Sequence, residues 1–248
     1  MKNLRGKVIL FIVSLTIVAG TVSAAWAQVE KGDSSWSGKV TAGYIFVSGT
    51  TDSQNGSLSL EMVRKSDIDK VTIKAQARHG KSEDVETANA QEGSLKLDRF
   101  LAGEKYIYGL LGLLHDKVNH IDIRYWLGIG AGYLLLKDER RSLEAEAGLE
   151  VSRETNYDQL QDIETFVRLA GLYKQRISEV ADFSQQLHLF PNLTESNAYR
   201  IKSVSALSTK VTEKVFIRLS VTITYDNEPP LDTEQMETRA ETSLLYSF

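Results

Sequence analysis

Apolar side chains recur at every second position along most of the chain after residue 35. In the clearest stretch, Ile217, Leu219 and Val221 share one phase, while Arg218 and Ser220 lie in the other. A β-strand points successive side chains to opposite faces, so a period of two predicts strands rather than helices. The pattern therefore predicts an all-β protein.

Twelve segments carry this alternation. They are predicted at 36–48, 53–65, 69–80, 87–98, 104–115, 121–136, 141–153, 162–175, 181–190, 198–209, 214–226 and 237–248. Each strand with its connection takes about 18 residues, which suits membrane strands of roughly 9–11 residues or more. The weakest segments are 87–98, which is polar in both phases, and 104–115, which is apolar in both.

The predicted connections alternate in length, and short ones lie near 66–68, 99–103, 137–140, 176–180 and 210–213. Longer, more polar ones lie near 81–86, 116–120, 154–161, 191–197 and 227–236. Short turns at one end and longer loops at the other are typical of bacterial outer-membrane barrels. An even number of strands then puts both termini at the short-turn end. We expect one domain, over 28–248.

A soluble β-sandwich alternates too, so the pattern needs a second argument to identify the solvent. The apolar phase carries no charge over as many as six consecutive positions, whereas the other phase collects most of the charged residues. Lysine or arginine at the lipid midplane costs about 2–4 kcal/mol, so lipid would exclude charge from one face only. This asymmetry favours an antiparallel transmembrane β-barrel of about twelve strands.

The chain ends on an alternating strand, with Leu244, Tyr246 and Phe248 in one phase. We expect this strand to close the barrel against the first strand, because hydrocarbon forbids an open edge. The same three residues are a candidate C-terminal assembly signal. The expected partners are the outer-membrane bilayer, periplasmic chaperones and the barrel-assembly machinery.

The first 27 residues have the features of a secretory signal peptide. Lys2, Arg5 and Lys7 precede an apolar run, and Ala25 and Ala27 form a small-residue cleavage site before residue 28. The apolar run is about 15 residues, shorter than the roughly 20 that a membrane helix needs. An uncleaved anchor is the alternative. We expect export through a cleaved signal peptide to the bacterial outer membrane.

Composition removes several classes of function. Cysteine is absent among the 248 residues, so disulfides, thiolate metal sites and a lipid-modified cysteine anchor are excluded. The formal charge is −4 and no basic excess appears, which argues against nucleic acid as a partner. No cofactor or metal ion is expected.

The inward phase holds a mixed set of charges that forms the candidate functional site. Its members are Asp122, Arg124, Glu144, Glu146, Glu150, Arg168, Arg200, Lys202 and Arg218. One interpretation is a narrow aqueous pore with a transverse field that selects polar or charged solutes. The other is a lumen closed by salt bridges. Twelve strands lie between the filled eight-stranded barrel and the open sixteen-stranded porin, so size leaves both open.

A second cluster lies around the connection at 116–120. His115, Asp116, His120 and Asp122 have the residue types of a hydrolase site or an imidazole–carboxylate metal site. No serine lies near enough in sequence to suggest a nucleophile. The simpler interpretation is solvated loop residues, and we assign no catalytic residue and expect no enzyme.

Several short motifs, in their order along the chain, resemble a bacterial family of unknown function described as salt-induced outer-membrane proteins (YdiY-like). They are Trp36-Ser37-Gly38, Ser48-Gly49-Thr50-Thr51-Asp52, Asp116, Ile121-Asp122-Ile123-Arg124, Gly128, Gly130, Gly132 and Tyr133, Ser142-Leu143, and Tyr246-Ser247-Phe248. The resemblance covers roughly residues 36–248. Thr50 departs from the asparagine expected in the family's first turn, which affects turn geometry more than membership.

The resemblance implies an outer-membrane barrel and brings no catalytic residues. We therefore expect a small passive pore with a mixed-charge lumen. The alternatives are a non-conducting structural barrel of the salt-stress response and an outer-membrane hydrolase that uses the His115–Asp122 loop.

Overall fold

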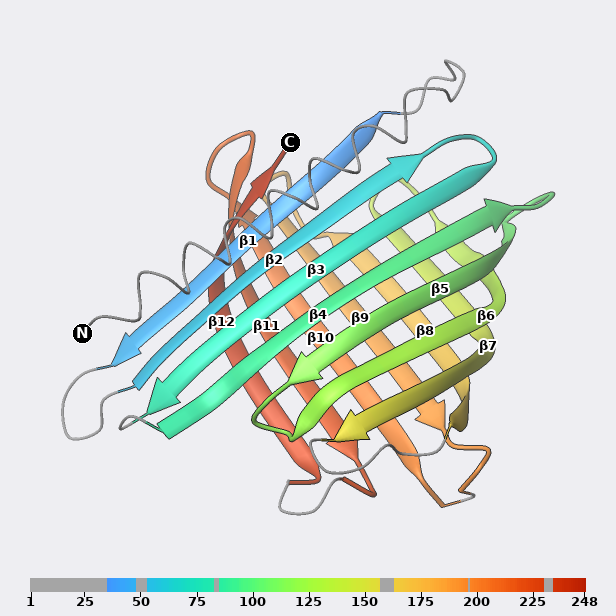
Figure 1. Cartoon of the computed structure of the whole chain (residues 1–248). Helices are drawn as coiled ribbons and strands as arrows, with labels where there is room; N and C mark the ends of the chain where they lie inside the picture. The colour runs from blue at the N-terminus through green and yellow to red at the C-terminus, as the bar shows by residue number, and fades with distance from the viewer. Residues whose placement is uncertain (1–34, 48–52, 83–84, 157–162, 196, 230–233) are drawn as a thin grey trace, which may run out of the picture. The chain divides into compact units, whose positions relative to one another are not determined.

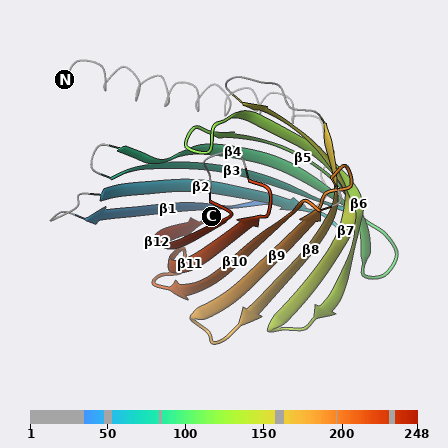
Figure 2. The same cartoon turned by 90° about the horizontal axis from the view of Figure 1, so that it is seen from below.

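A computed structural model describes residues 35–47, 53–82, 85–156, 163–195, 197–229 and 234–248. These residues form twelve antiparallel strands in a closed barrel (Figures 1 and 2). Each strand pairs with its neighbours in sequence, and the last pairs with the first. None of the described residues forms a helix long and apolar enough to cross a membrane.

The strands are β1 Trp36–Val47, β2 Ser53–Lys65, β3 Asp69–Ser82, β4 Val85–Phe100, β5 Lys105–Asp116, β6 Ile121–Lys137, β7 Arg141–Asn156, β8 Glu164–Arg176, β9 Ala181–Pro191, β10 Tyr199–Lys210, β11 Val215–Asp226 and β12 Met236–Ser247. The predicted number of strands, their antiparallel order and the closure by the C-terminal strand are confirmed. Every strand end lies within three residues of its predicted position.

The predicted difference in length between the two sets of connections holds only in part. The gap between β3 and β4 is just residues 83–84, because both strands run further than their patterns indicate. The β5–β6 connection, 117–120, has four residues, as many as three of the five turns at the other end. We call the end that carries turns 66–68 and 138–140 the short-turn rim, and the opposite end the long-loop rim. The predicted signal peptide and its Ala25 and Ala27 lie outside the described residues.

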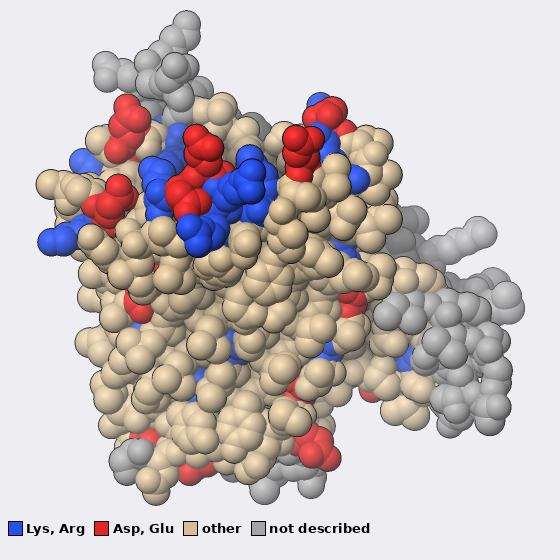
Figure 3. Space-filling model, turned by 180° about the vertical axis from the view of Figure 1, so that it is seen from behind, with Lys and Arg blue, Asp and Glu red and all other residues tan. Residues whose placement is uncertain are grey.

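The outer face of the barrel is apolar. Ile107, Leu127, Ile129, Leu149 and Leu219 all point outward and are exposed, each by 50% or more. Figure 3 shows charged side chains gathered at the two ends of one face, with few between them. An apolar band between charged rims is the surface that a bilayer requires of a barrel.

The inner face is polar apart from one small core. Tyr106, Tyr108 and Leu110 of β5 are buried, and Phe100 and Trp126 pack against them. This core explains why β5 is apolar in both phases: its outward residues belong to the lipid face and its inward residues to the core.

Side chains that accept backbone hydrogen bonds shape four of the five short turns. Ser66, Asp138 and Thr212 each accept bonds from the amides two and three residues later, and Ser178 accepts one from the amide of Val180. Such Asx and ST turns supply locally the bonds that the ladder no longer supplies. The fifth turn instead has Gly103 at a φ of 75°, where glycine has no steric penalty.

Candidate functional site

A buried carboxylate lies inside the barrel near the short-turn rim. The side chain of Asp98 on β4 is fully buried. Lys70 Nζ on β3 lies 3.0 Å from one carboxylate oxygen, and Lys96 Nζ lies 2.5 Å from the other. A buried carboxylate is costly unless it is paired, so the two lysines make this position tolerable.

Glu146 on β7 extends the network from β4 over the inner face of β5 and β6. Its carboxylate accepts hydrogen bonds from Lys96 at 2.5 Å, Arg168 at 2.7 Å and the hydroxyl of Tyr106 at 2.8 Å. Arg168 Nη1 also donates to the hydroxyl of Tyr108 at 3.0 Å. The same cations lie over the tyrosine rings, with Lys96 Nζ 4.8 Å from the ring centroid of Tyr108.

Glycines let the tyrosines of β5 reach across β6 to these partners. A Cβ atom at Gly132 would lie 2.5 Å from the hydroxyl oxygen of Tyr106, and one at Gly130 would lie 2.5 Å from that of Tyr108. Both distances are far inside van der Waals contact. A glycine on the inward phase of a strand leaves room for bulky neighbours, and here the rings of Tyr106 and Tyr108 occupy that room.

A second group of ion pairs lies toward the long-loop rim. Arg124 on β6 pairs with Glu154 on β7. Arg78 on β3 lies 3.7 Å from Asp116 and 3.5 Å from Glu237 on β12. The two groups together line the lumen with charges of both signs at two heights.

A further ion pair joins opposite sides of the barrel. Glu92 on β4 and Lys202 on β10 lie 3.9 Å apart, from oxygen to nitrogen. Six steps separate β4 from β10 in either direction around the closed barrel, so the two strands face each other. Their side chains remain 36% and 43% exposed, which leaves this pair accessible to water.

The predicted lumen residues do not form one cluster. Glu144 joins the first group, with its carboxylate 3.9 Å from Lys70. The guanidinium of Arg200 lies 4.3 Å from the ring centroid of Phe166, and its Nε is buried without a hydrogen-bond partner among the described residues. Glu150 is buried with 6% exposure. Arg218 lies on the inward phase of β11, and its carbonyl accepts a hydrogen bond from Ser243.

A bulge displaces Asp122 from the predicted network. The β6–β7 register shifts between Ile121 and Ile123, so Ile121 takes the inward position and is buried while Asp122 is exposed. The carbonyl oxygen of Asp122 lies 2.6 Å from Nδ1 of His115. The sequence shows no glycine or other mark of this bulge.

The histidine–carboxylate cluster does not converge on one point. Asp116 faces the lumen, where it lies near Arg78, and its side chain also accepts bonds from Asn119. His115 is at the exposed side of the loop, and His120 has a φ of 58° in the turn. Within the described residues, no group of three His, Asp or Glu side chains could hold a metal ion.

Sequence reasoning missed much of the first group, which includes Lys70, Lys96, Asp98, Tyr106 and Tyr108. Four of these lie on β4 and β5, whose alternation is the weakest. A buried cluster removes the polar–apolar contrast on which the pattern depends. The sequence feature that still pointed to this cluster was the row of inward glycines on β6, namely Gly128, Gly130 and Gly132.

Known proteins are similar to this chain in sequence and in fold. A family model described as "Protein of unknown function, DUF481" matches residues 40–248. The uncharacterized protein YdiY of Escherichia coli (strain K12) is 23% identical over 212 residues, which covers 85% of this chain and 82% of that protein.

Solved structures are also similar to this chain. The COG4313 outer membrane channel from Pseudomonas putida F1 has a TM-score of 0.51 and 13% identity, and the match covers 89% of this chain and 100% of that one. The translocator domain of the autotransporter NalP from Neisseria meningitidis has a TM-score of 0.46 and 11% identity, covering 98% of each chain. At 13% identity, the likeness to the COG4313 channel concerns the fold alone.

Proposed function

This chain belongs to the family described as protein of unknown function DUF481, which confirms the resemblance found in its sequence, and we propose that it is a narrow passive pore of the bacterial outer membrane. The observation that carries the proposal is the water-accessible pair Glu92–Lys202 across a lumen lined with charges of both signs. Outer-membrane barrels have their short turns on the periplasmic side, so in this proposal the short-turn rim faces the periplasm.

The two kinds of lumen charge have different roles in the proposal. Asp98 and Arg168 are buried and Glu146 is nearly so, and their ion pairs join β3 and β4 to β7 and β8 over the inner face of the two strands between. Glu92 and Lys202 are partly hydrated, and such exposed pairs are worth only about 0–1 kcal/mol. A weak pair can separate as a solute passes, so these two side chains form the constriction and set its selectivity.

Single-channel conductance in a planar bilayer tests the pore. Glu92→Gln leaves Lys202 alone at the constriction and is expected to shift ion selectivity toward anions. Lys202→Met leaves Glu92 alone and is expected to shift it toward cations. Lys210→Gln is the matched control, because Lys210 pairs locally with Glu213 at the rim. A gel shift between unboiled and boiled samples checks folding, and a folded barrel without discrete current steps contradicts the proposal.

The second candidate is a non-conducting envelope barrel of the salt-stress response. The buried network around Asp98 and Glu146 favours it, because those ion pairs connect β3 and β4 with β7 and β8 across the inside of the barrel and fill part of the lumen. This candidate predicts no conductance, raised expression in high salt, and a fragile envelope when the gene is deleted.

As part of the first proposal the protein has no catalytic activity. A hydrolase activity that disappears in His115→Ala or His120→Ala with the fold unchanged would contradict that part. The proposal also keeps Leu244, Tyr246 and Phe248 as the signal read by the assembly machinery. Phe248 suits that role because its ring lies against Gly38 and its backbone pairs with β1.

A further inference from the structure

The seam that closes the barrel is paired over only part of its length. β1 and β12 pair from Lys39 with Ser247 to Gly43 with Ser243, and the backbone of Phe248 bonds to that of Gly38 at 2.9 and 3.0 Å. Beyond Gly43 and Ser243, toward the long-loop rim, the described residues of the two strands do not pair. Figure 1 shows the two strands diverging in that direction.

Both strands are nevertheless formed along the unpaired part. β1 pairs with β2 as far as Val47 with Ser53, and β12 pairs with β11 from Met236 with Tyr225. Continuing the register of the paired half would place Tyr44 opposite Thr242. Each strand therefore presents an unpaired backbone edge to the other at the level of Tyr44 and Thr242, inside a wall that hydrocarbon surrounds.

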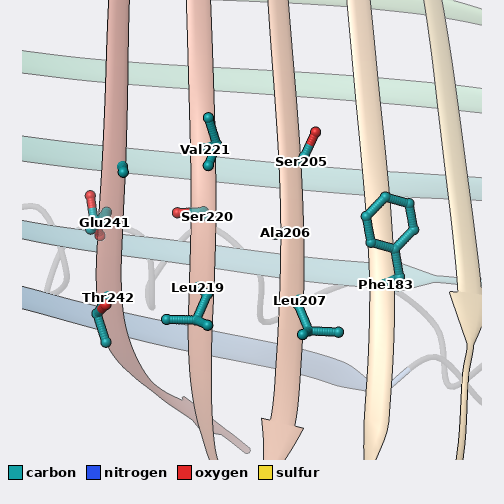
Figure 4. Close-up of a pocket in the computed structure, with 10 residues that line it drawn as sticks. Phe183, Ser205, Ala206, Leu207, Leu219, Ser220, Val221, Glu241 and Thr242 are labelled. Carbon is teal, nitrogen blue, oxygen red and sulfur yellow. The ribbon is translucent and has the colours of Figure 1, made fainter.

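The lumen side and the outer side of this unpaired part of the seam differ in chemistry. On the lumen side, the carboxylate of Glu241 accepts a hydrogen bond from Ser57 of β2 at 2.8 Å, and Arg239 lies 3.1 Å from Glu237. On the outer side, the face of β9–β12 has a depression of about 520 Å³ (Figure 4). It is lined mainly by Phe183, Leu207, Leu219, Val221, Ala240 and Thr242.

Ala240 and Thr242 belong to both features, since they line the depression and lie on the unpaired edge of β12. We propose that the half of the seam nearer the long-loop rim is a lateral opening, through which the lumen exchanges single-chain amphiphiles with the outer leaflet. The apolar chain lies in the depression, and the polar head reaches the edge and the charged lumen. The passage rests on the proposed pore, which supplies the axial route to the periplasm.

The physical reason is the cost of unpaired backbone groups in hydrocarbon. N–H and C=O groups at the edges of β1 and β12 need a partner, and the only partners within a bilayer are each other, water from the lumen or a polar head group. A seam that pairs only partly is thus a two-state element: it is open in this structure, it closes when the ladder continues, and an amphiphile that occupies it favours the open state.

Paired cysteines test the two states, and the absence of native cysteine makes the readout clean. Thr41→Cys with Leu245→Cys lies in the paired half, spares the three residues of the proposed assembly signal, and is expected to form a disulfide at once under mild oxidation. Tyr44→Cys with Thr242→Cys lies at the first unpaired position. It is expected to oxidise at least about tenfold more slowly, because a minor closed state is populated at roughly 10% or less. Dodecanoate is expected to slow only the second pair further. Equal oxidation rates, or no effect of dodecanoate, would overturn the proposal.

Two serine-to-cysteine variants test the lateral route without a disulfide. Ser57 lies beside the opening and Ser94 lies on the inward phase of β4, away from it. A pyrene maleimide confined to the bilayer is expected to label Ser57→Cys several times faster than Ser94→Cys, while a water-soluble maleimide labels both. Equal labelling from the bilayer would refute the opening. A silent bilayer recording beside unequal labelling would refute the pore and leave the opening, so the two failures are distinguishable.

Discussion

At the scale of single residues, the lumen depends on glycines that replace side chains where tyrosines cross. Gly132→Val places a branched side chain where the ring of Tyr106 lies, and overpacking of this kind costs about 1–3 kcal/mol. We expect the free energy of unfolding, measured by urea titration, to fall by that amount. Gly109→Val is the matched control, because no atom lies within 4 Å of a Cβ built at Gly109. An equal loss in both variants would mean that glycine matters here for the backbone and not for the tyrosine.

At the scale of elements, the short turn between β6 and β7 depends on the carboxylate of one residue, Asp138. The backbone amides of Arg140 and then Arg141 donate to Asp138 and hold its pKa below the ordinary value of an aspartate. The carboxylate form is the one stabilised, so its contribution is present at neutral pH and is lost as the pH falls through that lowered pKa. We expect Asp138→Asn to unfold more readily than the parent at pH 7, and we expect this difference to shrink at about pH 3, below the reference pKa of aspartate. Asp67→Asn, in the exposed turn 66–68, is expected to change nothing at either pH. A difference for Asp138→Asn that persists at low pH would assign the effect to shape rather than charge.

Elements also show where sequence reasoning succeeds and where it stops. Alternation located all twelve strands because lipid on one side and water on the other impose opposite chemistry on successive residues. It became weak at β5, where the inward side chains Tyr106 and Tyr108 pack a core and so resemble the lipid face. It misplaced Asp122, since one extra residue in a bulge inverts the phase of everything before it. Alternation reports the local environment, and both failures arise where that environment is set by a neighbouring strand.

At the scale of the whole molecule, closure creates contacts that no local pattern contains. Glu92 and Lys202 each look like ordinary inward charges, and only the number of strands makes them face each other. The seam behaves in the same way. The alternation of β12 runs through its full length, yet its pairing with β1 stops at Gly43 and Ser243. How far two strands pair depends on how the ends of the barrel meet, which is a property of the assembled ring.

The apolar band between the charged rims is a property of the whole barrel. It is tested most sharply by comparing outward residues at different depths in the bilayer. Ile129 and Leu135 both point outward from β6, with 65% and 55% exposure, but Ile129 lies near the middle of the strand and Leu135 near the short-turn rim. In a bilayer, Ile129→Arg is expected to cost about 2–4 kcal/mol and Leu135→Arg about 0–1 kcal/mol, because the penalty falls toward the interface. Urea unfolding from lipid vesicles measures both. A soluble barrel would tolerate arginine equally at the two exposed positions. Equal costs would therefore contradict a lipid-facing outer surface, and the confinement of charges to the lumen would lose its physical reason.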